Sequence, residues 1–309
     1  MGRVPGPIVR AILGAAIAGW PVAACAPAPE GPAAAIASEQ VTAGPAFDAS
    51  ATRQTVLDFV AAYADSPTEG PGALQGIVGG PELASWVRWL DVQHREFPGS
   101  IEAAAEVRDV EFVGEAVTGE LIGAQVALSA SVVFRFSPQD ADPFDRVRIL
   151  DGPVSVVQTE ERRFVVVDLL RDGVSMSDGI QIFEDLGDRM GPMDVAVDSL
   201  HMFPPNWQFN LVIRNRGTRP MSLRPELSGL YVRTSDGFER FEGIFTGSVE
   251  TVAPGGEVDG IFAFPMQDAP EGRVLTLAYG PGVEPRRFDF PLDGLVSVVP
   301  PPPLDAASG

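Results

Sequence analysis

Two segments in the first half of the chain place apolar residues at helical spacing. The first predicts an amphipathic helix over 51–64, which Ser50 could cap, and the second predicts a helix over 81–96 that ends before Pro98. The apolar stripes, spaced i, i+3, i+4 and i+7, are Val56, Phe59, Val60 and Tyr63 in the first helix and Leu83, Trp86, Val87 and Leu90 in the second. Each helix therefore has one face to bury against another element.

Beyond the second helix the apolar period changes to two, which is typical of half-buried strands. The longest alternating run is 126–136, and further strands are expected over 107–113, 146–158 and 162–170. Helices followed by such a meander predict an α+β unit over 51–184, with two helices on a curved antiparallel sheet.

The polar segment 185–192, which contains Gly and Pro, is the expected boundary of this unit. After it, over 190–292, only strand signals appear, separated by Asp-Gly and Pro-Gly-Gly turns. The expected strands are 207–214, 229–235, 238–245, 247–252, 258–264, 273–279 and 286–292. This pattern predicts an all-β, immunoglobulin-like sandwich. Its core must depend on Trp207 and on phenylalanines, because a single cysteine cannot form a disulfide between the sheets.

The first 24 residues predict a signal peptide. Arg3 and Arg10 make a basic start, and the apolar stretch 11–24 is too short to span a membrane as a mature helix. The stretch ends in Val22-Ala23-Ala24-Cys25, which resembles the lipobox of bacterial lipoproteins. The resemblance implies that the Cys25 thiol receives a diacylglyceryl group, with fatty acyl chains such as palmitate, and that cleavage occurs just before it. An ordinary secretory signal with a chance cysteine is the alternative.

The chain has 309 residues, and its 42 acidic and 22 basic residues give a net charge of −20. Every basic residue is Arg, and removal of residues 1–24 takes away two of them, which leaves 20 Arg against 42 acids, or −22. Such a surface repels polyanions, which argues against nucleic-acid binding. It also does not adhere to an anionic membrane, so a lipid anchor must hold it there. Residues 25–50 predict a flexible tether and residues 293–309 a disordered Pro-rich tail.

The first unit resembles the nuclear transport factor 2-like superfamily. The resemblance rests on the opening helices, on Trp86 and Trp89, on the long strand 126–136 and on the closing strand 163–170. It implies a cone of sheet and helices with an apolar pocket, which some members use for isomerase or dehydratase chemistry.

The second unit resembles the telokin-like, immunoglobulin-related domains of bacterial surface lipoproteins. The segments that carry this resemblance are Asn215 with Gly217, Asp236-Gly237, Ala253-Pro254-Gly255-Gly256 with Phe262-Ala263-Phe264-Pro265, and Phe288-Asp289-Phe290. It implies secretion and an adhesive or scaffolding role, without a catalytic site.

Four residues could line a pocket in the first unit: Tyr63, Trp86, His94 and Asp168. Asp168 shares a strand face with apolar neighbours, which could raise its pKa and make it a general base, and His94 on a helix stripe could serve likewise. Each has a structural alternative, namely a strand end that reaches solvent, a histidine at the edge of the core, and ordinary core aromatics.

The sequence contains no complete metal or cofactor motif. Asp140, Asp142 and Asp145 lie close together, as calcium prefers, but the glycine and distal glutamate of a helix-loop-helix calcium site are missing, and a solvated hairpin tip is favoured. The second histidine, His201, lies in the other predicted domain from His94, which argues against a shared metal site. A Gly-rich phosphate loop, a nucleophile elbow and a zinc helix are all absent.

Together these patterns predict a lipid-anchored protein on the outer face of the bacterial cytoplasmic membrane, or in the periplasm or outer membrane. Its expected role is to bind or scaffold an envelope protein partner, with no cofactor and no catalytic residues. The alternative is a small-ligand carrier or isomerase-like enzyme that uses the apolar pocket of the first unit.

Overall fold

The computed structural model describes residues 47–96, 100–118, 121–137, 142–204, 206–235, 237–247, 249–265, 272–280 and 285–292. The chain divides into two compact units, Met1–Pro45 and Ala46–Gly309, and every described residue lies in the second. The predicted signal peptide, Cys25 and the tail 293–309 fall outside the described residues.

Three helices open the described chain: α1 (Ala49–Glu69), α2 (Gly72–Gln75) and α3 (Pro81–Glu96). The residue that caps α1 is Asp48 and not Ser50, because an Asp48 Oδ1 atom accepts the backbone N–H groups of Ser50 and Ala51 at 2.9 Å each. The cap lies one residue before the helix, and Ser50 is already in its first turn. The bounds of α3 agree with the prediction.

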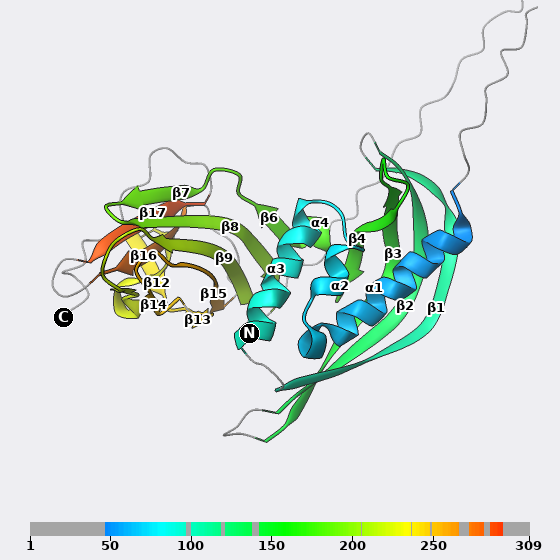
Figure 1. Ribbon diagram of the computed structural model, residues 1–309, viewed down its shortest axis with the longest axis horizontal. Helices are drawn as coiled ribbons and strands as arrows, with labels where there is room; N and C mark the ends of the chain where they lie inside the picture. Colours follow the sequence, from blue (N-terminus) through cyan, green and yellow to red (C-terminus); the bar gives the residue numbers. More distant parts are fainter. Residues whose placement is uncertain are drawn as a thin grey trace, which may run out of the picture. The chain divides into compact units, whose positions relative to one another are not determined.

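Five strands follow in simple meander order, β1 to β5, all antiparallel. Their bounds are β1 (Ile101–Thr118), β2 (Leu121–Phe136), β3 (Phe144–Gln158), β4 (Phe164–Arg171) and β5 (Val174–Ser175). Helix α1 packs against one face of this sheet (Figure 1). The buried cluster between them contains Phe59, Trp86 and Val126, all with at most 1% of their surface exposed.

The rest of the described chain is almost entirely strands. A short helix, α4 (Met176–Gly179), leads into a six-stranded sheet in which β13, β15, β9, β8 and β6 are neighbours in that order and β7 also pairs with β8. Its strands are β6 (Ile180–Ile182), β7 (Gly187–Met190), β8 (Met193–Phe203), β9 (Asn206–Asn215), β13 (Ile244–Thr246) and β15 (Glu257–Pro265). A four-stranded sheet contains β12 (Gly237–Phe241), β11 (Gly229–Thr234), β16 (Arg273–Tyr279) and β17 (Arg286–Pro291), and β10 (Met221–Ser222) pairs with β14 (Thr251–Val252).

The predicted fold class, an α+β unit of the nuclear transport factor 2 type followed by an immunoglobulin-like sandwich, is wrong. The described chain is mainly antiparallel β-structure, divided among several sheets. Strand β6 belongs in sequence to the first predicted unit, but it pairs with β8 in the second large sheet. The polar segment 185–192, expected to be a boundary, contains β7, which forms a hairpin with β8. Polar residues can form a paired strand where their side chains face solvent, and the four residues of β7 are all exposed.

Candidate binding cavity

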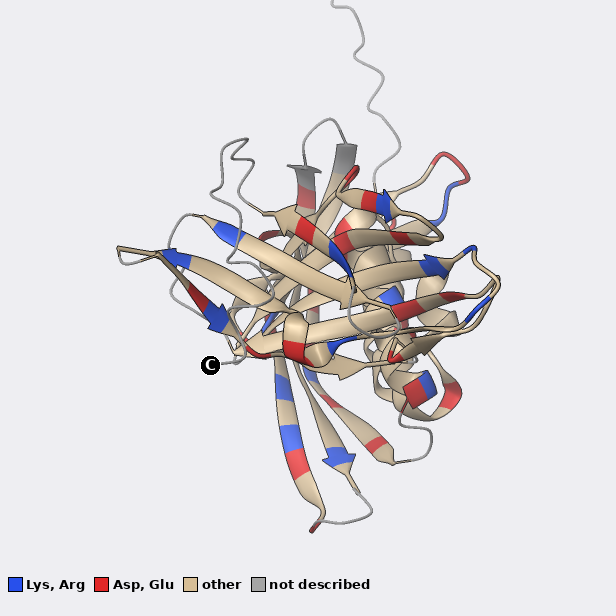
Figure 2. Ribbon diagram, turned by 90° about the vertical axis from the view of Figure 1, so that its left-hand side faces the viewer, with Lys and Arg blue, Asp and Glu red and all other residues tan. Residues whose placement is uncertain are grey.

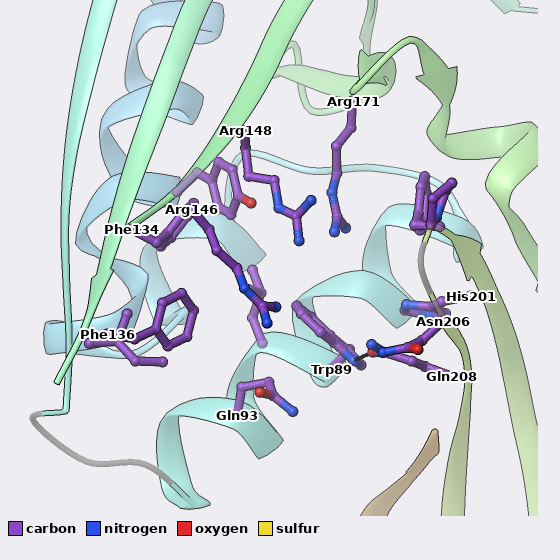
Figure 3. Close-up of a pocket in the computed structure, with 15 residues that line it drawn as sticks. Trp89, Gln93, Phe134, Phe136, Arg146, Arg148, Arg171, His201, Asn206 and Gln208 are labelled. Atoms are coloured by element: carbon purple, nitrogen blue, oxygen red, sulfur yellow. Dashed lines mark hydrogen bonds between the residues drawn. The ribbon is translucent and has the colours of Figure 1, made fainter. Parts of the chain in front are cut away.

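A cavity of about 160 Å³ lies where α3 faces the ends of β3, β4 and the β8–β9 hairpin. Figure 3 shows side chains that converge on it from both large sheets and from the helices. Its lining includes Tyr63 from α1, Trp89 and Gln93 from α3, Phe134 and Phe136 from β2, Arg146 and Arg148 from β3, Arg171 from β4, His201 and Phe203 from β8, and Asn206 and Gln208 from β9.

The charge of the cavity wall is opposite to that of the chain. Three arginines, Arg146, Arg148 and Arg171, are among the residues that line it, and those residues include no Asp or Glu. Elsewhere acidic and basic residues are interspersed over the described strands and helices (Figure 2). Arg146 and Arg148 face the cavity together because alternate residues of a strand point to the same side of its sheet. The cavity is therefore a local positive site in a protein of net charge −20.

Arg171 is the least solvated of the three arginines. It is 6% exposed, and its Nε atom has no hydrogen-bond partner among the residues that the structure describes. Its Nε atom lies 3.9 Å from Asp172 Oδ2, and its guanidinium lies over the ring of Phe203, 4.5 Å from the centroid. Burial lowers the pKa of Arg171, but an arginine stays protonated in proteins, so a positive charge is held in the wall.

The other two arginines are progressively more exposed. Arg148 donates through Nη1 to Asp172 Oδ2 at 2.8 Å, and its side chain is 22% exposed. Arg146 is exposed, and its guanidinium lies 5.3 Å from the ring centroid of Phe136 and 5.4 Å from that of Phe144. The three cations thus form a series that runs from solvent into the protein.

Aromatic rings form much of the remaining wall. Tyr63 is 3% exposed, and its ring centroid lies 5.2 Å from that of Phe134 and 4.8 Å from that of Trp86. Burial raises the pKa of Tyr63, although Arg171 and Arg148 act in the opposite direction, so the phenol is neutral and can donate a hydrogen bond. A ligand with a flat apolar part would contact these ring faces.

His201 belongs to a buried polar cluster behind the cavity. Its Nε2 atom lies 3.1 Å from Ser85 Oγ and 3.3 Å from Asn210 Nδ2, and Ser85 Oγ lies 2.5 Å from Ser199 Oγ. Since an amide N–H can only donate, Nε2 is the acceptor and the ring proton is on Nδ1. Burial, with Arg171 and Arg88 nearby, lowers the pKa of His201 to about 3, so the ring is neutral.

These contacts attach α3 to the β8–β9 hairpin. Trp89 Nε1 also donates to Gln208 Oε1 at 2.5 Å, and Arg88 is paired with Asp198. The cavity wall is therefore built on hydrogen-bonded elements and not on a loop.

The structure brings only part of the predicted pocket lining together. Tyr63 lines the cavity, and Trp86, at 1% exposure, packs beneath it. His94 is elsewhere, where its Nδ1 atom lies 2.9 Å from the carbonyl oxygen of Pro67 and joins α3 to the end of α1. Asp168 accepts hydrogen bonds from Ser175 Oγ at 2.7 Å and from the backbone N–H of Ser177 at 3.1 Å. Neither predicted base, His94 or Asp168, is among the residues that line the cavity.

The sequence interpretation missed the three arginines and His201. A signal for two of them was present, because Arg146 and Arg148 have the same strand parity as the buried Leu150 and so lie on the inner face. Arg171 and His201 likewise have the strand parity of buried Leu169 and Phe203, but which elements cover them depends on segments distant in sequence.

The described residues contain neither a cluster of metal ligands nor a helix that could span a membrane. Among the described residues no three His, Cys, Asp or Glu side chains are grouped as metal ligands, and Asp140 of the predicted acidic loop lies outside them. No helix within the described part of the chain has the length and apolarity needed to cross a membrane.

Comparisons with known proteins do not assign the chain to a family. No protein-family model matches it, and no curated protein matches it in sequence. One solved structure, the intermembrane space region of the chloroplast protein ARC6, aligns with 41% of this chain and 98% of its own length at 10% identity and a TM-score of 0.31. A similarity at that level supports no conclusion about fold or function.

Proposed function

We propose that this chain is a lipid-anchored extracytoplasmic binding protein, and that the cavity beside α3 is its site for a small organic anion. The observation that carries the proposal is Arg171, a buried cation whose Nε atom has no hydrogen-bond partner among the described residues, in a wall with two further arginines. The carboxylate beside it, Asp172 at 3.9 Å, is shared with Arg148, so the charge of Arg171 is only partly balanced. A poorly balanced buried charge is costly, and an anion in the cavity would relieve that cost.

The location part of the proposal is supported by the lipobox-like Val22-Ala23-Ala24-Cys25 and by the acidity of the chain. The lipid would hold the protein on the outer face of the cytoplasmic membrane, or in the periplasm or outer membrane. The arginine-lined cavity favours the alternative prediction, a small-ligand carrier, over a protein that binds or scaffolds an envelope partner.

We expect Cys25→Ala to release the protein from membranes into the soluble fraction, because the substitution removes the thiol that would take the lipid. The measurement is fractionation of cells that express the full chain. Ser38→Ala, a conservative change within the predicted tether, is the matched control and should leave the protein in the membrane fraction. Continued membrane association of the Cys25→Ala chain would refute the anchor.

We expect benzoate to raise the melting temperature of the full-length protein and benzamide, its neutral analogue, not to do so. A ligand at about 100 times its Kd stabilises the folded state by about 2.7 kcal/mol. Arg171→Met should weaken benzoate binding at least tenfold by calorimetric titration. Arg135→Met, which removes an exposed arginine from the other face of the same sheet, should have no effect. Equal responses to benzoate and benzamide would contradict an anion site.

A further inference from the structure

We infer that the group recognised by this cavity is a phosphate monoester and not a carboxylate, an inference that rests on the proposed anion site. The groups that would seat it are Arg146, Arg148 and Arg171, with Asp172 as the acid that accompanies them.

The arginines of this site carry more positive charge than the neighbouring carboxylate balances. Asp172 is the carboxylate paired with these arginines, at 2.8 Å from Arg148 and 3.9 Å from Arg171. The guanidinium of Arg146 lies over the rings of Phe136 and Phe144, which do not neutralise its charge. Three guanidinium groups and one carboxylate leave two formal positive charges. A phosphate monoester carries about −1.5 to −2 at neutral pH, whereas a carboxylate carries −1 and would leave one cation unmatched.

Hydrogen-bond donors of the side chains reach the cavity from several directions. Arg146 and Arg148 extend from β3, Arg171 comes from the end of β4, and Gln93 and Gln208 lie across the cavity on α3 and β9 (Figure 3). A carboxylate accepts hydrogen bonds at two coplanar oxygens. A phosphate monoester offers three terminal oxygens in a tetrahedral arrangement, which suits donors on several sides, and arginine can bind such oxygens in bidentate fashion.

The size of the cavity limits how much of the organic part of the ligand it can enclose. A cavity of about 160 Å³ is smaller than the roughly 300–1,000 Å³ of sites that enclose drug-sized molecules. It can hold the phosphate group and the first few atoms attached to it, against the rings of Tyr63, Phe134 and Phe136. The gradient of exposure, from Arg146 at the outside to Arg171 at the inside, places the charged group deepest and leaves the rest of the ligand toward solvent.

The test is calorimetric titration of the full-length protein with three matched aromatic anions: phenyl phosphate, methyl phenyl phosphate and benzoate. The diester keeps the phosphorus and the ring but has one charge only. We expect phenyl phosphate to bind at least tenfold more tightly than either of the other two. Arg148→Met and Arg146→Met should each remove most of that preference, with Arg135→Met as the control and thermal melting as the check on folding.

The outcomes separate the two proposals. Benzoate binding as tight as that of phenyl phosphate would overturn the phosphate inference and leave the anion site standing, whereas failure of all three to bind would overturn both. The phosphate group can belong to a soluble ester or to a lipid. Sedimentation of the Cys25→Ala chain with phosphatidic acid vesicles, but not with phosphatidylcholine vesicles, would support a lipid source. Phenyl phosphate binding without sedimentation would support a soluble one.

Discussion

Replacement of Trp86 by Ala should lower the free energy of unfolding by about 3–5 kcal/mol, the range for removal of a large aromatic side chain from a packed core. Trp86 is 1% exposed, and its ring centroid lies 6.0 Å from that of Phe59 and 4.8 Å from that of Tyr63. Its Nε1 atom has no hydrogen-bond partner among the described residues, so the loss comes from packing and not from a broken hydrogen bond.

Denaturant unfolding of the full-length protein measures this loss. Val113→Ala is the control, because Val113 is 64% exposed on β1 and its truncation should change stability by less than about 0.5 kcal/mol. Since Trp86 supports Tyr63 in the cavity wall, the variant should also weaken anion binding. A loss below 1 kcal/mol would contradict the packing described for this core.

Acidification should destabilise the protein through His201 by on the order of 4–5 kcal/mol between pH 6.5 and pH 3. Burial, followed by the charges of Arg171 and Arg88, lowers the folded-state pKa of His201 from 6.5 to about 3. Between these values the unfolded chain binds a proton that the folded chain does not. The stability contribution of neutral His201 is therefore fully present above about pH 6.5 and is lost as the pH falls toward 3.

A substitution of His201 tests this contribution directly. His201→Gln should flatten the dependence of stability on pH below 6.5, because it removes the group that binds the proton. An NMR titration of the unmodified protein provides a test that does not depend on how the variants fold, because the ring signal of His201 should stay that of a neutral imidazole down to about pH 4. A midpoint near 6.5 would show that His201 is solvated.

Much of the secondary structure followed from local patterns. The predicted helix over 81–96 and the strand over 273–279 have the bounds of α3 and β16, and the run 126–136 lies within β2. In α3 and β2 one face is buried, so the apolar period is visible in the sequence, whereas β16 is a short run that is buried almost throughout. The predicted helix over 51–64 was too short, because α1 runs to Glu69 through Ser66 and Pro67, whose types do not suggest a buried helix end.

The fold class failed for a physical reason that is visible at β6 to β8. Strand β6 has only three residues, β7 is polar throughout, and β8 was not anticipated at all. Strand β8 has a local period of two that the prediction overlooked, with Met193, Val195 and Val197 buried. The short β6 and the polar β7 offer no such pattern, and their strand conformation depends on pairing with β8.

The candidate site shows the same division between local and distant information. Tyr63 and Trp86 were found because the apolar stripe of a helix predicts which side chains are buried, and both are at most 3% exposed. Arg171 was not found, because the strand that carries it gives no indication that Phe203 of β8 and Trp89 of α3 will lie over its guanidinium.

The sequence by itself determined the bounds of α3 and β16, the placement of Tyr63 and Trp86 in the core, and a net charge of −20. Only the tertiary structure decided that three arginines meet in one cavity, that β6 joins the sheet of β8, and that His201 is a buried neutral ring. The apolar residues that form the buried face of a helix or strand lie close together in sequence, so their positions repeat with a regular period along the chain. The burial of a charge depends on which distant segments cover it, and that is settled only when the sheets pack.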